Sequence, residues 1–277
     1  MAKLWRRPPP PFSDPVLQED VPVCGGLARA FRFRSGVVAR QHAVLCIAGM
    51  GANGRSFARQ EPLAERWPFV LLNTPNETPA HVDPIEYAAD AVEAYLDRER
   101  LEQPILLASS FGGAVAARVA LRRPQRIGAL IMADAVVSRR QIPLAFPGFV
   151  DLLNAPDWLA RLVSPMAVQI MGGFHLDPPA RDEIVRESRV FESRELKRRL
   201  SALLRVDLLP ELERLRIPSL CIHGSRDLLV PWRRGRWLAD ALEGVFVLIR
   251  GAGHLPYLTH AAEFNARLSR FLETFDL

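Results

Sequence analysis

The sequence predicts an α/β fold with a mostly parallel, doubly wound sheet, because short apolar runs alternate with amphipathic segments. Several of the runs are almost wholly apolar, as expected for parallel strands that are covered on both faces. One long interval with helical patterns but no convincing strand interrupts the alternation and indicates a helical insertion. The predicted strands are 27–34, 43–48, 69–73, 105–109, 127–133, 219–223 and 245–250.

Helices are predicted between these strands, at 84–100, 112–122, 235–242 and 261–275. In the first of them, Ile85, Ala88, Ala89, Val92 and Leu96 recur with the period of an amphipathic helix. The strandless interval spans residues 135–216, and prolines break its helical patterns into several segments. We therefore expect a core at 27–134 and 217–277, a helical cap over the strand ends at 135–216, and a proline-rich N-terminal arm at 1–26.

The composition is that of a soluble globular protein, with 277 residues, 49% hydrophobic and 24% charged. A charged residue or a proline interrupts every apolar run before it reaches the roughly 18 residues that a membrane helix needs, so we expect no membrane span. The net charge of +5 is concentrated in residues 1–40, and charges elsewhere are interspersed. This pattern disfavours a nucleic-acid-binding surface.

Three cysteines, Cys24, Cys46 and Cys221, lie far apart in the sequence, which disfavours a disulfide framework. Cys46 and Cys221 lie in apolar runs, where a free thiol behaves as a small hydrophobic side chain. The prolines Pro8–Pro11 stand where an export signal would need an apolar run. We therefore expect a cytoplasmic protein.

The candidate nucleophile is Ser110, in a segment that runs from the apolar strand 105–109 through small residues into a helix. A sharp turn between a strand and a helix strains its central residue and requires small side chains two positions before and after it. Ala108 and Gly112 meet this requirement around Ser110, whereas Leu107 and Phe111 would not meet it around Ser109. The other interpretation is that Ser110 is only the N-cap of the helix.

A serine hydroxyl becomes a good nucleophile when an imidazole takes its proton and a carboxylate orients that imidazole. His254, in a Gly-rich loop after strand 245–250, is the candidate base, and Asp227, in the loop after strand 219–223, is the candidate acid. Asp134, at the end of strand 127–133, is the alternative acid. His223 ends a strand and could be a buried supporting group.

With Ser110, Asp227 and His254, the chain from about residue 29 onward resembles the α/β-hydrolase fold family. It is most similar to the cap-bearing esterases, thioesterases and carbon-carbon hydrolases of that family. The order serine, acid, histidine is the order of that family. The resemblance implies an eight-stranded sheet with a cap between the sixth and seventh strands. It also implies acyl transfer to water through an acyl-enzyme, with no metal and no organic cofactor. Serine at position 110 separates the chain from haloalkane dehalogenases and epoxide hydrolases, which have aspartate there.

The resemblance also implies an oxyanion hole formed by the backbone N–H groups of Met50 and Phe111, with Gly49 permitting the turn. Ala48 stands where the family commonly has histidine. Gly49, Gly51 and Gly54 have the spacing of a dinucleotide-binding loop, but the helical unit and acidic ribose partner of that motif do not follow. The segment 73–78 departs from the family's usual Asp-x-x-Gly-x-Gly turn.

The predicted function is hydrolysis of an ester-like bond in a small, largely apolar acyl substrate. Two alternatives stay open: a ligand receptor or scaffold of the same fold that does not turn over its ligand, and transfer of the acyl group to another acceptor. The sequence gives no oligomeric state. The candidate pocket residues, between the serine turn and the cap, are Gly49, Met50, Phe111, Phe146, Phe149, Trp158 and Met171.

Overall fold

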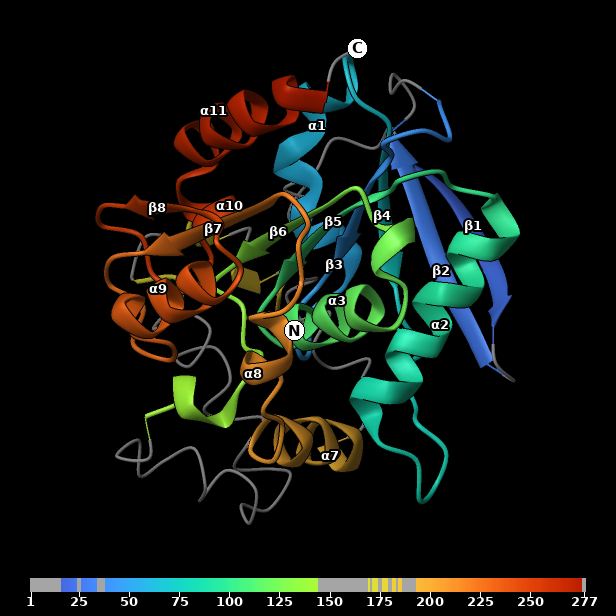
Figure 1. Cartoon of the computed structure of the whole chain (residues 1–277), viewed down its shortest axis with the longest axis horizontal. Helices are drawn as coiled ribbons and strands as arrows, with labels where there is room; N and C mark the ends of the chain where they lie inside the picture. The colour runs from blue at the N-terminus through green and yellow to red at the C-terminus, as the bar shows by residue number, and fades with distance from the viewer. Residues whose placement is uncertain are drawn as a thin grey trace, which may run out of the picture.

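The computed structural model describes residues 16–23, 26–33, 38–143, 169, 171–173, 176–178, 181–182, 184–185 and 193–275. Its centre is an eight-stranded sheet in the order β1-β2-β4-β3-β5-β6-β7-β8 (Figure 1). The pairs β1 with β2 and β2 with β4 are antiparallel, and all later pairs are parallel. The strands are β1 Val16–Val23, β2 Gly26–Phe33, β3 Val44–Ile47, β4 Phe69–Asn73, β5 Ile105–Ser109, β6 Ala129–Ala133, β7 Ser219–Gly224 and β8 Val245–Ile249. The predicted fold class is confirmed.

Strand β1 was not predicted, because the sequence analysis assigned its residues to the N-terminal arm. It pairs with β2 along its whole length, from Val16 opposite Phe33 to Val23 opposite Gly26. As an edge strand it exposes one long side, so Leu17 is 55% exposed while Val21 is buried. Polar residues and Pro22 therefore break the apolar pattern that marks the inner strands.

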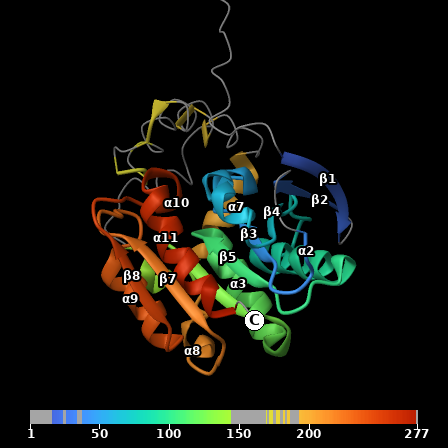
Figure 2. The same ribbon diagram turned by 90° about the horizontal axis from the view of Figure 1, so that it is seen from above.

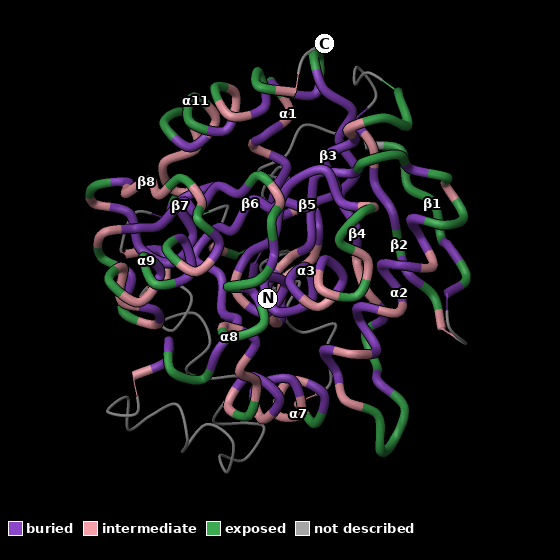
Figure 3. The backbone as a smooth tube through the Cα atoms, in the orientation of Figure 1, coloured by how far each residue is buried: buried purple, intermediate pink, exposed green. Residues whose placement is uncertain are grey.

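Two hydrophobic cores cover the faces of the sheet, as the alternation in β3 shows. Leu45 and Ile47 belong to the core beneath α2, α3 and α9. Val44 and Cys46 face the other core, beneath α10 and α11. Figure 2 shows α2 near β1 and β2 at one end of the sheet and α9 near β8 at the other, and Figure 3 shows that the central strands are buried.

The α-helices outside the interval between β6 and β7 are α1 Glu61–Ala64, α2 Pro84–Glu99, α3 Phe111–Arg122, α9 Trp232–Ala241, α10 Pro256–Thr259 and α11 Ala261–Leu272. The 3₁₀ helices are η1 Gly54–Gln60, η2 Pro124–Arg126, η3 Arg139–Gln141 and η4 Glu273–Phe275.

Helix α2 illustrates how local sequence sets an element's ends. Asp83 caps its first turn by accepting hydrogen bonds from the amides of Ile85 and Glu86, and Pro84 occupies the first helical position. The helix stops at Arg100, which adopts a left-handed conformation with φ 51°. The predicted helix 84–100 is thus confirmed to within one residue.

The interval between β6 and β7 contains, among its described residues, η3, α7 Ser193–Leu203 and α8 Leu209–Leu212. Helix α7 contacts both α2 and α3. Phe146, Phe149 and Trp158 lie outside the described residues. Across the described part of the chain, none of the helices combines the length and apolar character required to span a bilayer.

Candidate active site

Ser110 lies between the last residue of β5 and the first residue of α3, with φ 50° and ψ −120°. This conformation is strained for a residue with a side chain, and it is the geometry of a nucleophile elbow. The side chain of Ser110 makes no capping hydrogen bond to α3, so the N-cap interpretation is wrong. Two backbone amides, those of Gly113 and Val136, donate to the carbonyl of Ser110 and fix the turn at 2.9 and 3.1 Å.

Close packing around this turn explains its small residues. A Cβ atom on Gly112 would lie 2.4 Å from the carbonyl oxygen of Ile47, and one on Gly113 would lie 2.4 Å from the Cβ of Ala135. Ala108 is completely buried within β5, where its methyl group is accommodated. The position two residues after the serine thus requires glycine, whereas the position two residues before it accepts alanine.

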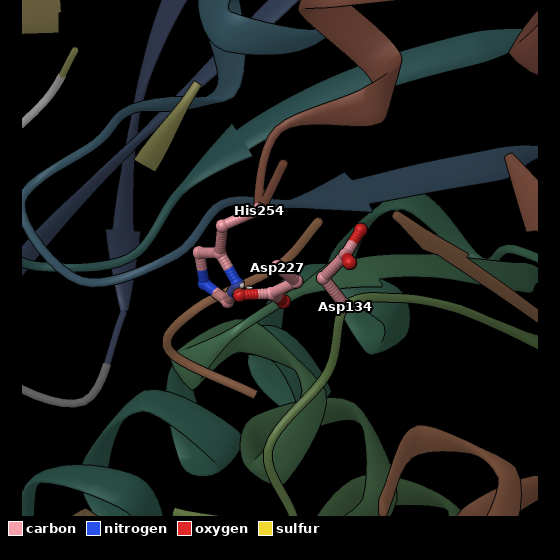
Figure 4. Close-up of side chains that lie close together, drawn as sticks. All are labelled: Asp134, Asp227 and His254. Atoms are coloured by element: carbon pink, nitrogen blue, oxygen red, sulfur yellow. Dashed lines mark hydrogen bonds and ion pairs between the residues drawn. The ribbon is translucent and has the colours of Figure 1, made fainter. Parts of the chain in front are cut away.

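His254 and Asp227 form a buried, hydrogen-bonded pair, with 2.7 Å between His254 Nδ1 and Asp227 Oδ2 (Figure 4). The other carboxylate oxygen of Asp227 accepts from the amides of Leu229 and Val230 at 2.8 and 3.0 Å. These amides fix the carboxylate, and the carboxylate fixes the imidazole with its proton on Nδ1. His254 Nε2 is buried and has no hydrogen-bond partner among the described residues, so its lone pair is available to accept a proton.

The loops that carry this pair meet because β7 and β8 are parallel neighbours whose carboxyl ends lie at one edge of the sheet, the edge at which the parallel strand β5 also ends. A Cβ on Gly224 would lie only 1.9 Å from the carbonyl oxygen of Gly253, so the two loops approach more closely than a side chain allows. Ser109 Oγ donates to Tyr257 Oη at 3.3 Å and joins the end of β5 to α10. Met171, a predicted pocket residue, accepts a hydrogen bond at its carbonyl from the amide of His254 at 2.6 Å.

Asp134, the alternative acid, lies beside the pair but does not hydrogen-bond to His254 (Figure 4). It follows β6 with φ 46°, and its Oδ1 accepts from the amide of Gly224 at 2.9 Å. Potential ligand atoms of Asp134, Asp227 and His254 lie within 4.8 Å of one another. A metal ion there would have to displace the hydrogen bond between His254 and Asp227, so the arrangement fits an acid and base pair better than a metal centre.

The electrostatics of the cluster reinforce this arrangement. Burial raises the pKa of the Asp227 carboxyl, but the imidazoles of His254 and His223 outweigh burial and hold that pKa well below its usual range. For His254, burial opposes the charged form, yet the carboxylate of Asp227 prevails and raises the pKa above its ordinary value. Burial also raises the pKa of Asp134, to about 7. Asp227 is therefore the carboxylate that is ionised at neutral pH and orients His254.

The Gly-rich loop after β3 forms a tight turn, because the amide of Ala52 donates to the carbonyl of Gly49 at 3.2 Å and Gly51 has φ 73°. Gly49 lies against Ser110, since a Cβ there would be 3.1 Å from the Cβ of Ser110. Met50 is half-buried in this turn. Phe111 begins α3, so its amide lies among the first helical N–H groups, which have no partner within the helix.

The unusual segment after β4 also has a defined shape. Asn73 Oδ1 accepts from the amide of Gly54, and Thr78 Oγ1 donates to Glu195 on α7 at 2.7 Å. Arg199, one turn further along α7, donates to Glu195 at 2.9 Å, and both side chains are buried. The sequence analysis missed this pair, because a Glu and an Arg four positions apart on a helix usually indicate an exposed surface pair.

The similarity to known proteins agrees with this geometry. The family described as "Alpha/beta hydrolase family" matches residues 44–267. A pimeloyl-[acyl-carrier protein] methyl ester esterase of Neisseria meningitidis serogroup C is 29% identical, covering 83% of this chain and 93% of the relative. The protein of that name from Edwardsiella ictaluri is 34% identical, covering 62% of this chain and 70% of the relative.

Among solved structures, an esterase from Exiguobacterium antarcticum superposes with a TM-score of 0.83 at 17% identity, covering 93% of this chain and 100% of that one. That likeness concerns the fold alone. The strand order described above is that of this chain. The match of the family over residues 44–267 includes the serine turn, the acid loop and the histidine loop. This chain belongs to the α/β-hydrolase family.

Proposed function

We propose that this chain is a serine ester hydrolase in which Ser110 is the nucleophile, His254 the general base and Asp227 the residue that orients it. The observation that carries the proposal is the 2.7 Å bond from His254 Nδ1 to Asp227, which leaves the buried Nε2 without a partner among the described residues. Membership of the family and the named esterases among the relatives support ester cleavage.

The proposed reaction has two halves. Ser110 Oγ attacks the acyl carbon, and its proton passes to His254 Nε2, which then donates it to the leaving alcohol as the carbon-oxygen bond breaks. Water next gives a proton to Nε2 and attacks the acyl-enzyme. The acid leaves, and Ser110 recovers its proton. Throughout, the Asp227 carboxylate stabilises the imidazolium that forms in each half.

The amides of Met50 and Phe111 are the proposed donors to the oxyanion. Their support is the tight turn at Gly49–Ala52 and the start of α3 directly after Ser110. Such donors act because they are fixed before the negative charge develops, so no reorganisation is needed during the reaction. The dipole of α3, which starts beside Ser110, favours the same negative charge.

The proposed substrate is a carboxylic ester with a small alcohol and a largely apolar acyl group. The relatives named as methyl ester esterases support a small leaving alcohol. We propose that residues 135–216 form a cap over the site, since α7 packs across α2 and α3 and Met171 contacts the histidine loop. The proposed pocket residues that the structure describes are Gly49, Met50, Phe111 and Met171. A cytoplasmic location stays a prediction.

A fluorophosphonate probe tests the assignment directly, because it forms a covalent bond only with an activated serine. We expect labelling at Ser110, located by peptide mass spectrometry, and hydrolysis of short p-nitrophenyl esters. Ser110→Ala should abolish both while the circular dichroism spectrum stays unchanged. Tight ester binding without labelling or turnover would support a receptor, and labelling with product transfer to an added alcohol in preference to water would support an acyltransferase.

A further inference from the structure

A second imidazole lies directly behind the pair of Asp227 and His254. His223, near the end of β7, has a side chain that is only 3% exposed. Its Nε2 lies 2.7 Å from the carbonyl oxygen of Val230 and 3.4 Å from both Asp134 Oδ1 and Asp227 Oδ2. Nε2 of His223 therefore lies at the same distance from two buried carboxylates. One is Asp227, which hydrogen-bonds to His254, and the other is Asp134, which does not.

Among the described residues, the imidazoles of His223 and His254 are the groups whose charge favours the ionised form of Asp134. Its side chain is completely buried, Oδ1 accepts one backbone hydrogen bond, and Oδ2 has no partner among the described residues. The residue also holds a left-handed conformation, which is costly for an aspartate. A buried carboxylate of this kind requires a nearby cation, and the group positioned to supply one is His223.

We propose that Asp134 and His223 are positioning residues of the active site: His223 is an imidazolium held between two buried carboxylates, and it keeps Asp227 directed at His254. This inference rests on the proposed function. The carboxylate of Asp134 keeps His223 protonated, and the positive charge of His223 compensates the negative charge of Asp227. In the absence of this cation, Asp134 would take up a proton more readily, and the Asp227 carboxylate would act on His254 without a positive neighbour.

The titration behaviour of the cluster agrees with this arrangement. Burial opposes the charged form of His223, but the carboxylates of Asp134 and Asp227 outweigh it and raise its pKa to about 9. The pKa of Asp134 is raised to about 7. Between these two values Asp134 is ionised while His223 is protonated, so the ion pair is complete near pH 8.

In the described part of the chain, the elements around His223 contribute no competing charge close to the ring. Helix α9 packs Gly235 against it, because a Cβ there would lie 2.2 Å from Nδ1. Strand β8 places the ring of Phe246 at a centroid distance of 6.5 Å, and Arg236 of α9 stacks on the ring of Phe246. The charged groups that face His223 are thus Asp134 from β6, Asp227 from the loop after β7 and, beyond it, His254 from the loop after β8.

The first test is a pair of substitutions read by the pH dependence of kcat/KM. His223→Gln keeps a donor for the Val230 carbonyl but removes the cation, so the pKa of His254 should rise. We expect the acidic limb to move upward by about one pH unit and kcat/KM at a pH on that limb to fall about tenfold. Without the cation Asp134 is protonated near neutral pH, so adding Asp134→Asn should leave the limb within a few tenths of a pH unit of its position in His223→Gln. His42→Gln, which changes a histidine far from the cluster, should leave the profile unchanged.

The second test measures the protonation of His223 directly and does not depend on enzyme activity. In the Ser110→Ala protein, the His223 ring should titrate by NMR with a midpoint near the pKa of about 9 given by the surrounding carboxylates, and adding Asp134→Asn should lower that midpoint by one unit or more. A midpoint near the ordinary value of about 6.5 or an unmoved acidic limb in His223→Gln would each overturn the proposal. Wild-type turnover that does not depend on Ser110 would instead overturn the proposed function, and the NMR result would still stand.

Discussion

The guanidinium of Arg199 lies 5.3 Å above the centre of the Phe111 ring. Phe111 is the residue after the nucleophile, and Arg199 belongs to α7, which lies between β6 and β7 in the chain. The same guanidinium donates to Glu195 and to the carbonyl of Pro75 at 2.9 and 2.6 Å. One buried ion pair therefore joins α7, the segment after β4 and the serine turn.

Breaking this ion pair on one side should destabilise the protein strongly. Arg199→Met removes the closer of two cations from the buried Glu195 carboxylate, since Arg198 lies 3.5 Å from it. We expect a loss of about 3 kcal/mol in the free energy of unfolding by urea denaturation. Arg199→Met combined with Glu195→Leu removes both charges and should lose less than the single variant. If the double variant is as unstable as the single one, the buried charge is not the cause.

An exposed pair with the same spacing provides the control. Arg236 and Asp240 on α9 are joined at 3.0 Å but are 55% and 61% exposed. Asp240→Asn should change the free energy of unfolding by only about 0.5 kcal/mol or less. Comparing the two helices separates the effect of burial from that of sequence spacing, since both pairs are four residues apart.

Sequence spacing did not identify Glu195 and Arg199 as a buried pair, because spacing alone does not show whether a pair is buried. An acid and a base four residues apart look alike on buried and exposed helices, because burial depends on which segment packs against them. The strand β1 was missed because an edge strand needs only half of its side chains to be apolar. The other seven strands and the turn at Ser110 could be predicted, since the central strands are buried on both faces and close packing at a strained turn restricts residue type directly.

The structure favours Asp227 over Asp134 as the acid, and mutagenesis can test that preference. Asp227→Asn reverses the hydrogen-bond preference at His254 Nδ1, so we expect kcat to fall by about 10³–10⁴-fold. Asp134→Asn keeps an acceptor for the Gly224 amide and does not touch His254, so its effect on kcat should stay within about tenfold. Steady-state hydrolysis of one ester by both purified variants decides between them. An Asp134→Asn loss equal to that of Asp227→Asn would make Asp134 the acid.

The raised pKa of His223 predicts how stability changes with pH. Its folded value of about 9 exceeds the unfolded value of about 6.5, so its stabilising contribution is complete below pH 6.5 and disappears as pH rises through 9. The free energy of unfolding should therefore decrease between pH 6.5 and pH 9. His223→Gln should reduce that decrease when urea denaturation is measured at both values. An identical pH dependence in the two proteins would mean that His223 is neutral in the folded state.

Gly112 provides a steric test of the serine turn. Gly112→Ala would place a methyl group 2.4 Å from the carbonyl oxygen of Ile47 and 2.6 Å from that of Ala48. Backbone atoms of β3 and of the oxyanion loop would have to move, so we expect a loss of about 1–3 kcal/mol in the free energy of unfolding and a larger proportional loss of kcat than of substrate affinity. Ala108→Gly, on the other side of Ser110, removes a methyl group without creating a clash. It should cost only about 1 kcal/mol and leave kcat nearly unchanged, whereas equal kinetic effects of the two variants would show that the turn does not depend on this contact.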